Sequence, residues 1–97
     1  MSNEFRQHIW QVQKRESLFM RADYEADGMG HLFDGEWRNV LKKAYPWKTA
    51  SKHYRLIRDE GSKATDVRFV KVDRDTGEVV REVAITKTDA LGFRNAQ

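Results

Sequence analysis

The sequence contains no cysteine, a single proline and no long apolar run. Without cysteine the chain can form no disulfide, carries no thiolate nucleophile and cannot ligate zinc or an iron–sulfur cluster through sulfur. No stretch approaches the roughly 20 apolar residues of a membrane span, and the N-terminal residues lack a signal-peptide core. We therefore expect a soluble, cytoplasmic protein that uses no cofactor and makes no contact with membranes.

One stretch of the chain also lacks acidic residues altogether. Residues 37–58 contain no aspartate or glutamate, although the whole chain has 15 acidic residues against 18 lysines and arginines. Seven of those cations fall inside the stretch, together with two tryptophans and two tyrosines. Cations neutralise phosphates while aromatic rings stack or pack, so this composition predicts a surface that binds an anionic partner.

The segment before this basic stretch is acidic. Residues 23–36 hold five acidic side chains and no lysine or arginine. Such loops are usually solvated, but this one could also fold against the basic stretch and screen it until a stronger anion displaces it. A further alternative is a divalent cation held by Asp23, Glu25, Asp27 and His31, since carboxylates and imidazole are common metal ligands.

Apolar residues near a period of 3.6 predict an N-terminal helix over roughly residues 4–21. The stripe consists of Phe5, Ile9, Val12 and Phe19. The alternative is a strand through residues 8–12, where Trp10 and Val12 alternate with glutamines.

The middle of the chain is predicted to be a loop followed by a helix. Residues 23–35 contain three glycines and favour a loop. Over residues 35–45, apolar side chains repeat at i, i+3, i+4 and i+8, Asp34 suits the N-cap, and Pro46 would end the helix. The aromatic residues of this stripe, Trp37 and Tyr45, are expected to pack in the core, which leaves Trp47 as the more exposed aromatic.

Residues 47–61 fit two structures. As a helix, the segment would be capped by Thr49 and ended by Gly61. As a strand, Tyr54 and Leu56 would alternate with Arg55 and Ile57. The cap and the stop favour the helix.

Two β-branched runs in residues 66–85 flank a polar turn and predict a β-hairpin, with Gly77 at a position that needs positive φ. The alternation within the hairpin is imperfect, so either both faces are partly covered or a bulge shifts the register. Residues 86–97 are predicted to be a C-terminal tail. The sequence thus predicts a small single α+β domain over residues 1–85, with N-terminal helices and a C-terminal β-hairpin.

Residues 49–61, TASKHYRLIRDEG, are similar to the recognition helix of winged helix-turn-helix DNA-binding domains. The hairpin at 66–85 follows where such a wing would lie. The resemblance implies that the helix at 35–45 precedes the turn, and that Arg74 at the wing tip reaches the DNA backbone. It also implies that the second helix approaches the major groove or its phosphates through Ser51, Lys52, Tyr54, Arg55 and Arg58.

These observations predict a small, basic, non-catalytic nucleic-acid-binding domain, such as a DNA-binding regulator, with DNA favoured over RNA. The alternative is an inhibitor or adaptor of the kind carried by phages or mobile elements, which would dock on an acidic protein surface of a nucleic-acid-processing or defence complex. If residues 53–58 are a strand, the chain instead resembles small ribosome-dependent ribonuclease toxins. The sequence leaves a homodimer open. The predicted contact residues are Arg38, Lys42, Lys43, Trp47, Lys48, Lys52, Tyr54, Arg55, Arg58 and Arg74.

Overall fold

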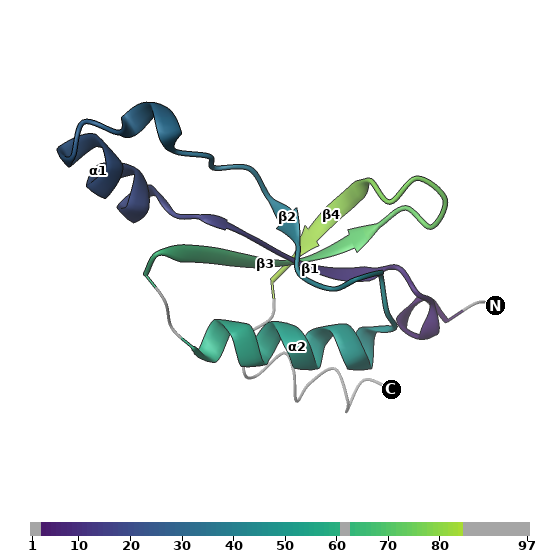
Figure 1. Cartoon of the computed structure of the whole chain (residues 1–97). Helices are drawn as coiled ribbons and strands as arrows, with labels where there is room; N and C mark the ends of the chain where they lie inside the picture. Colours follow the sequence, from purple (N-terminus) through teal and green to yellow (C-terminus); the bar gives the residue numbers. More distant parts are fainter. Residues whose placement is uncertain (1–2, 61–62, 85–97) are drawn as a thin grey trace.

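The computed structural model describes residues 3–60 and 63–84, which form a four-stranded antiparallel sheet with a helix across one face (Figure 1). The strand order in the sheet is β2-β1-β3-β4. In chain order the elements are η1 (Glu4–Arg6), β1 (Trp10–Glu16), α1 (Leu18–Ala26), η2 (Gly30–Leu32), β2 (Arg38–Asn39), α2 (Trp47–Asp59), β3 (Thr65–Val72) and β4 (Val79–Val83).

The central strand β1 corrects the prediction of a helix over residues 4–21. It pairs with β3 along its whole length, from Trp10 opposite Lys71 to Glu16 opposite Thr65. Its first four residues are buried, which means that both faces of the strand are covered there. The alternation of Trp10 and Val12 with glutamines was therefore the correct signal, and the 3.6-residue stripe was misleading.

The core lies between the sheet and α2. Trp10, Val12 and Phe69 point from β1 and β3 toward Ala50 and Tyr54 of the helix. The ring of Phe69 lies 5.5 Å from that of Trp10 and 5.8 Å from that of Tyr54, measured between centroids. The helix predicted for residues 47–61 is confirmed over Trp47–Asp59, and the strand alternative for residues 53–58 is wrong. Pro46, rather than Thr49, occupies the N-cap position, and the predicted stop at Gly61 lies outside the described residues.

The hairpin of β3 and β4 confirms the other strong sequence prediction. Gly77 has φ +75°, and its amide donates to the carbonyl oxygen of Asp73 over 2.9 Å. The carboxylate of Asp73 accepts the backbone N–H groups of Asp75 and Thr76. A register shift falls between Lys71 and Val72, and residues on both faces of β3 are buried, so both explanations of the imperfect alternation hold.

Residues 35–45 do not form the predicted helix. Apart from the two residues of β2, they run irregularly along the edge of β1, where the amide of Val40 donates to Val12 and Tyr45 forms a bridge with Trp10. Between those two points the side chain of Gln11 replaces a strand partner. Its Oε1 accepts the amide of Leu41 at 3.1 Å, and its Nε2 donates to the Leu41 carbonyl at 3.3 Å.

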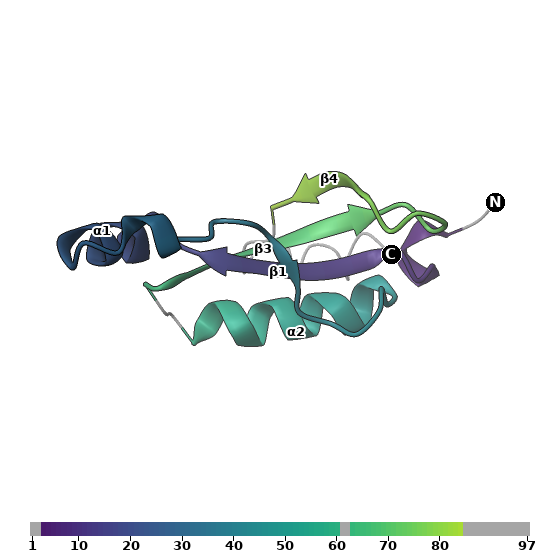
Figure 2. The same ribbon diagram turned by 45° about the horizontal axis from the view of Figure 1, so that its top comes forward.

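An arm projects from one end of the sheet. It comprises residues 17–36, with α1 and η2, and it extends past the sheet and α2 in both views (Figure 1, Figure 2). The predicted loop at 23–35 is thus partly helical, because α1 reaches Ala26. The α+β class is confirmed, but the expected order of N-terminal helices followed by a hairpin is wrong. The predicted tail at 86–97 lies outside the described residues, and no helix within the described part is long and apolar enough to cross a membrane.

Candidate nucleic-acid interface

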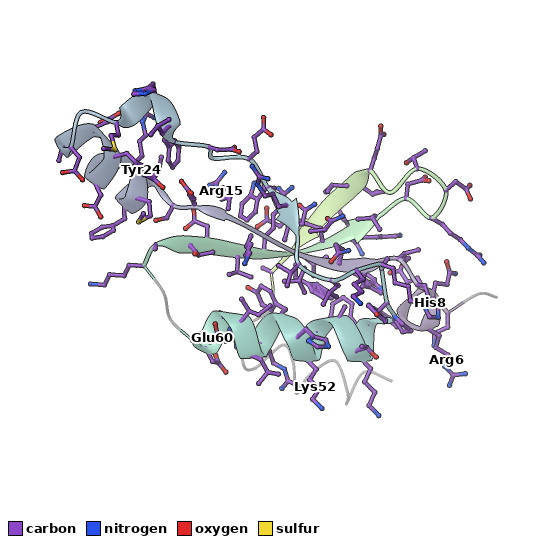
Figure 3. All side chains as sticks on the ribbon, in the orientation of Figure 1. Arg6, His8, Arg15, Tyr24, Lys52 and Glu60 are labelled. Atoms are coloured by element: carbon purple, nitrogen blue, oxygen red, sulfur yellow. The ribbon has the colours of Figure 1, made fainter. Side chains whose placement is uncertain are left out.

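The exposed side of α2 carries a stripe of three cations. Lys48, Lys52 and Arg55 occupy positions i, i+4 and i+7 and are all exposed, whereas Ala50 and Tyr54 of the same helix are buried against the sheet. A helix that buries one side with a period of 3.6 must present the opposite side to solvent. Figure 3 shows Lys52 pointing away from the sheet. We call Lys48, Lys52 and Arg55 the basic face.

The basic face is not neutralised by acidic neighbours. Within residues 3–60 and 63–84, no carboxylate forms an ion pair with any of its three cations. The next residue along the stripe, Asp59, lies 3.5 Å from Arg58 instead. The first turn of α2 also contains no acidic residue. The helix therefore presents a concentrated positive potential near its N-terminal half.

Two more of the predicted cations precede the helix. Lys42 and Lys43 are exposed on the irregular segment that leads into α2, and neither has an ion pair in the described part of the chain. The ammonium of Lys43 lies 5.6 Å from the ring centroid of Tyr45. Lys43 also lines a cavity of about 500 Å³ together with His8 and Arg74, which places Arg74 at the hairpin end of the sheet and not on the basic face.

Three other predicted contact residues have structural partners. Arg38 forms an ion pair with Asp34, and the pKa of Asp34 is lowered first by the backbone N–H of Glu36 and then by Arg38. Arg58 lies against Asp59 and over the ring of Tyr54. The winged-helix resemblance implied that Tyr54 approaches the major groove or its phosphates, but its side chain is buried.

Trp47 contradicts the expectation that it is the exposed aromatic. It is half-buried and packs edge-on against Trp10 at 4.6 Å between centroids. Its ring also lies 5.0 Å from Phe69 and 5.2 Å from Phe5. Trp47 therefore closes the end of the core rather than offering a stacking platform.

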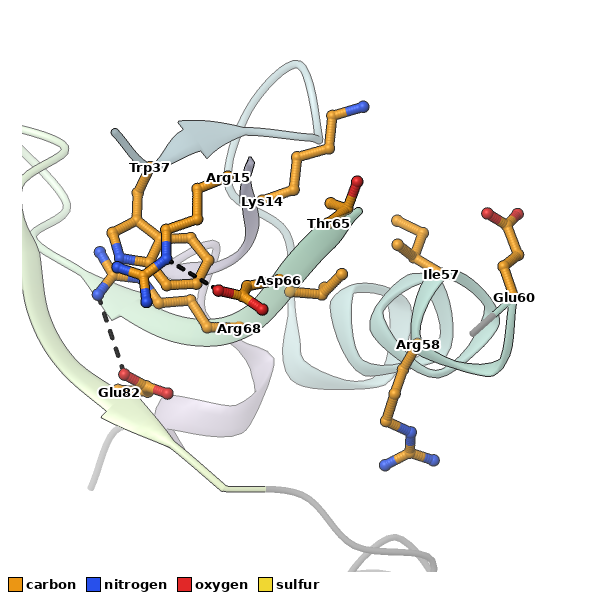
Figure 4. Close-up of a pocket in the computed structure, with 11 residues that line it drawn as sticks. Lys14, Arg15, Trp37, Ile57, Arg58, Glu60, Thr65, Asp66, Arg68 and Glu82 are labelled. Atoms are coloured by element: carbon orange, nitrogen blue, oxygen red, sulfur yellow. Dashed lines mark hydrogen bonds and ion pairs between the residues drawn. The ribbon is translucent and has the colours of Figure 1, made fainter. Parts of the chain in front are cut away.

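A second charged region, on the sheet, was missed by the sequence analysis. A cavity of about 700 Å³ is lined by Arg15, Trp37, Asp66 and Arg68, among others (Figure 4). The guanidinium carbons of Arg15 and Arg68 each lie 4.4 Å from the centroid of the Trp37 ring. Arg15 pairs with Asp66 at 3.2 Å, and Arg68 lies 3.9 Å from Glu82.

All residues of this cluster can be read from the sequence, but their proximity depends on the secondary structure of residues 10–16. Gln13 and Arg15 share a face with Asp66 and Arg68 only if residues 10–16 form a strand, as the register of β1 with β3 shows. A helix at 4–21 separates them. The cluster is internally neutralised, because each arginine has a carboxylate and Arg68 also donates to Gln13 over 2.7 and 2.9 Å. It has less capacity to attract an anion than the basic face.

No family model, curated protein or solved structure matches this chain. The winged-helix resemblance therefore remains a prediction: the helix that it placed at 49–61 corresponds to α2, while the helix that it required at 35–45 is absent. In the described residues, no three His, Asp or Glu side chains come together in a group that could hold a metal ion. What the structure defines is a small α+β domain with an exposed basic helix.

Proposed function

We propose that the protein is a non-catalytic nucleic-acid-binding domain that contacts phosphates through the basic face of α2. The observation that supports this function is that Lys48, Lys52 and Arg55 are exposed side by side and have no acidic partner in the described residues. A cation that already pairs with a carboxylate must lose that pairing to bind a phosphate. An unpaired cation instead gains an interaction and releases condensed counterions from the nucleic acid.

Duplex DNA is the preferred ligand on grounds of shape. With 13 residues, α2 is about 20 Å long at 1.5 Å per residue, and its outer side is unobstructed by the sheet. The major groove of B-form DNA, about 12 Å wide, admits a helix of this kind. The major groove of A-form RNA is too deep and narrow for side chains to read. Lys42 and Lys43 would add phosphate contacts beside the N-terminal end of the helix.

The proposal is tested by titrating duplex DNA, single-stranded DNA and duplex RNA of one sequence at several salt concentrations. We expect duplex DNA to bind most tightly. For duplex DNA the logarithm of the association constant should fall linearly with the logarithm of salt concentration, by roughly 0.9 for each neutralised phosphate. Replacing Lys48, Lys52 and Arg55 by alanine should weaken binding roughly tenfold or more and reduce that slope by roughly 2 to 3.

A matched variant controls for the loss of net charge. Arg21, Lys63 and Arg81 are also exposed cations, but they lie on the arm, before β3 and on β4. Their triple alanine variant carries the same net charge as the basic-face variant, and we expect it to keep nearly all DNA affinity. Equal losses in both variants would show that only overall charge matters. Absence of nucleic-acid binding even at low salt would refute the function and leave an acidic protein surface as the target of the basic face.

A further inference from the structure

The arm, residues 17–36, is anchored at its base by buried Ser17, but its helices are not packed into the domain. No residue of α1 or η2, both of which lie wholly in the described part, is buried. The main ring contact inside the arm joins Tyr24 to Phe33, whose centroids are 6.4 Å apart. A nine-residue helix that buries none of its side chains gains little from tertiary packing, which is the usual source of helix stability in proteins.

The arm also carries a large share of the exposed apolar surface. In the part of the chain that the structure describes, large apolar side chains are exposed at seven positions, and four of these lie on the arm. They are Leu18 (67% exposed), Phe19 (57%), Met29 (47%) and Leu32 (58%). Apolar side chains grouped on a projecting element indicate a surface that a partner covers.

The charge of the arm identifies the partner. The arm has five acidic residues against one arginine, Arg21, which pairs with Glu25. Asp34 pairs with Arg38, and Asp23, Asp27 and Glu36 have no ion pair in residues 3–60 and 63–84. Three unpaired acids beside exposed apolar residues complement the basic face of α2, where three unpaired cations lie on the helix that also exposes Leu56.

The arm cannot cover the basic face of its own molecule. Tyr24 of the arm and Lys52 of α2 lie well apart in Figure 3, with the end of the sheet between them. The arm instead extends the long axis of a molecule whose principal extents are 54 × 31 × 18 Å. Asp34 of the acidic segment pairs with Arg38 of the basic stretch, but the arm does not reach the basic face within one chain. The basic face that it can reach is that of a second chain.

We propose that the arm of one molecule docks on the basic face of a second copy, and that the second arm returns the contact. Two-fold symmetry makes such an exchange reciprocal, so that one dimer contains two identical contacts. Stable interfaces bury roughly 1,200–2,000 Å² in total, an area that two helix-sized contacts reach more readily than one. The proposal builds on the proposed function, because the arm and nucleic acid would then compete for the same face.

Self-association is measured without nucleic acid, so that the two proposals can fail separately. In sedimentation velocity experiments on the full chain, we expect a concentration-dependent dimer that weakens between about 0.05 M and about 0.5 M salt. The arm variant Asp23→Lys/Asp27→Lys and the face variant Lys48→Glu/Lys52→Glu should each dimerise at least roughly tenfold more weakly, since each places like charges in both contacts. All four substituted positions are exposed, so the fold should persist in both variants.

Mixing the two variants provides the decisive experiment. The reversed arm of one then faces the reversed α2 of the other, while the unchanged arm faces an unchanged α2, so both contacts become complementary again. We expect a one-to-one heterodimer of near wild-type affinity. The matched control for the arm variant is Asp75→Lys/Glu78→Lys, which makes the same charge change on the exposed hairpin turn. We expect this control to dimerise as tightly as the wild type.

Three outcomes would contradict the proposed dimer. A wild-type chain that stays monomeric at all concentrations, an arm variant that still dimerises, or a mixture that does not associate would each overturn the proposal. The competition has its own readout: the arm variant should bind duplex DNA more tightly than the hairpin control of equal net charge. Normal DNA binding by a monomeric wild-type chain would remove the dimer and leave the proposed function standing.

Discussion

The two sides of the molecule use their cations in opposite ways. On α2, Lys48, Lys52 and Arg55 are exposed, and no carboxylate among the described residues pairs with them. On the sheet, Arg15 and Arg68 pair with Asp66 and Glu82 and lie beside the Trp37 ring. The number of positive charges is therefore a poor guide to a binding surface. The absence of a local partner distinguishes a cation that is available to a ligand from one that maintains the fold.

The charges on the sheet belong to a network that also uses buried amides. Gln13 is almost fully buried; its Nε2 donates to Asn39 at 2.9 Å, and its Oε1 accepts two N–H groups from Arg68. Each member satisfies groups on its neighbours, so the network links β1, β2 and β3 on the face opposite α2. Such networks favour one arrangement of a surface because an unpaired buried polar group is costly. The basic face has no equivalent constraint.

The largest expected effect concerns the boundary between core and binding surface. Trp47→Ala should reduce the free energy of unfolding by about 3 kcal/mol, near the low end for tryptophan in a core because the side chain is half-buried. The loss arises from its contacts with Trp10, Phe69 and Phe5. Urea denaturation followed by far-ultraviolet circular dichroism measures it.

The neighbouring substitution Lys48→Ala is the control for this prediction. Lys48 is exposed and unpaired, so its removal should change the unfolding free energy by no more than about 0.5 kcal/mol. Among molecules that remain folded, Lys48→Ala should reduce DNA affinity more than Trp47→Ala does. If Trp47→Ala leaves stability unchanged but abolishes DNA binding, Trp47 belongs to the ligand surface and the distinction between the two regions fails.

A smaller effect tests whether the sheet network is structural. Gln13→Leu keeps the approximate size of the side chain but leaves Asn39 and Arg68 without their amide partner. We expect a loss of about 1 kcal/mol in the unfolding free energy, near the net contribution of one hydrogen bond, because Asn39 is exposed and Arg68 is half-buried, so water replaces part of the lost pairing. DNA affinity should remain within about twofold, since Gln13 lies on the far side of the sheet from α2 and supplies no charge.

Lys52→Ala should show the opposite pair of results, with stability preserved and DNA affinity reduced. Together the two variants would show that stability depends on the sheet network and DNA affinity on the basic face. A Gln13→Leu protein that is as stable as the wild type but binds DNA poorly would indicate that the sheet, rather than the basic face, meets the ligand.

The elements that the sequence predicted correctly are those with local signals. The hairpin is marked by β-branched runs and by Gly77, whose φ of +75° suits glycine. The helix at 47–61 was predicted from a cap at Thr49 and a stop at Gly61, and it forms even though Pro46 occupies the N-cap position. In each of these two segments, the residues that favour its secondary structure lie within the segment itself, in the hairpin turn or on the inner side of the helix. The predicted contact residues of α2 were not separated by side in the same way: Lys48, Lys52 and Arg55 are exposed, whereas Tyr54 is buried.

The N-terminal half could not be predicted because long-range pairing determines it. Phe5, Ile9 and Val12 fit a helical stripe, yet β1 becomes the middle of the sheet by pairing with β3, whose paired residues lie 49 to 61 positions later in the chain. Buried Gln11 obscures the strand pattern, since its amide substitutes for a missing backbone partner of Leu41. The Arg15–Trp37–Arg68 cluster depends on that same pairing, so it was hidden along with the strand.

The smallest effect separates the regions by pH. The backbone N–H groups of Thr76 and Asp75 lower the pKa of Asp73 below its ordinary value of 3.8, so the folded state favours the ionised carboxylate. This contribution to stability is present above pH 3.8 and is lost as the pH falls through the lower folded-state pKa. Glu4, hydrogen-bonded by Lys71, and Asp34 have lowered pKa values and the same sign, and neither they nor Asp73 lie on the basic face. Acid sensitivity should therefore arise outside α2.

The variant Asp73→Asn retains a side-chain oxygen that can accept both N–H groups but cannot be protonated at low pH. We expect its urea midpoint to fall less than that of the wild type between about pH 6 and about pH 2.5. Asp75→Asn is the control in the same turn, because its carboxylate accepts no hydrogen bond from the described residues, and its acid-induced fall should equal that of the wild type. An Asp73→Asn protein with the full wild-type decrease would show that the turn carboxylate does not contribute, and the acid response would then have to be sought at Glu4 and Asp34.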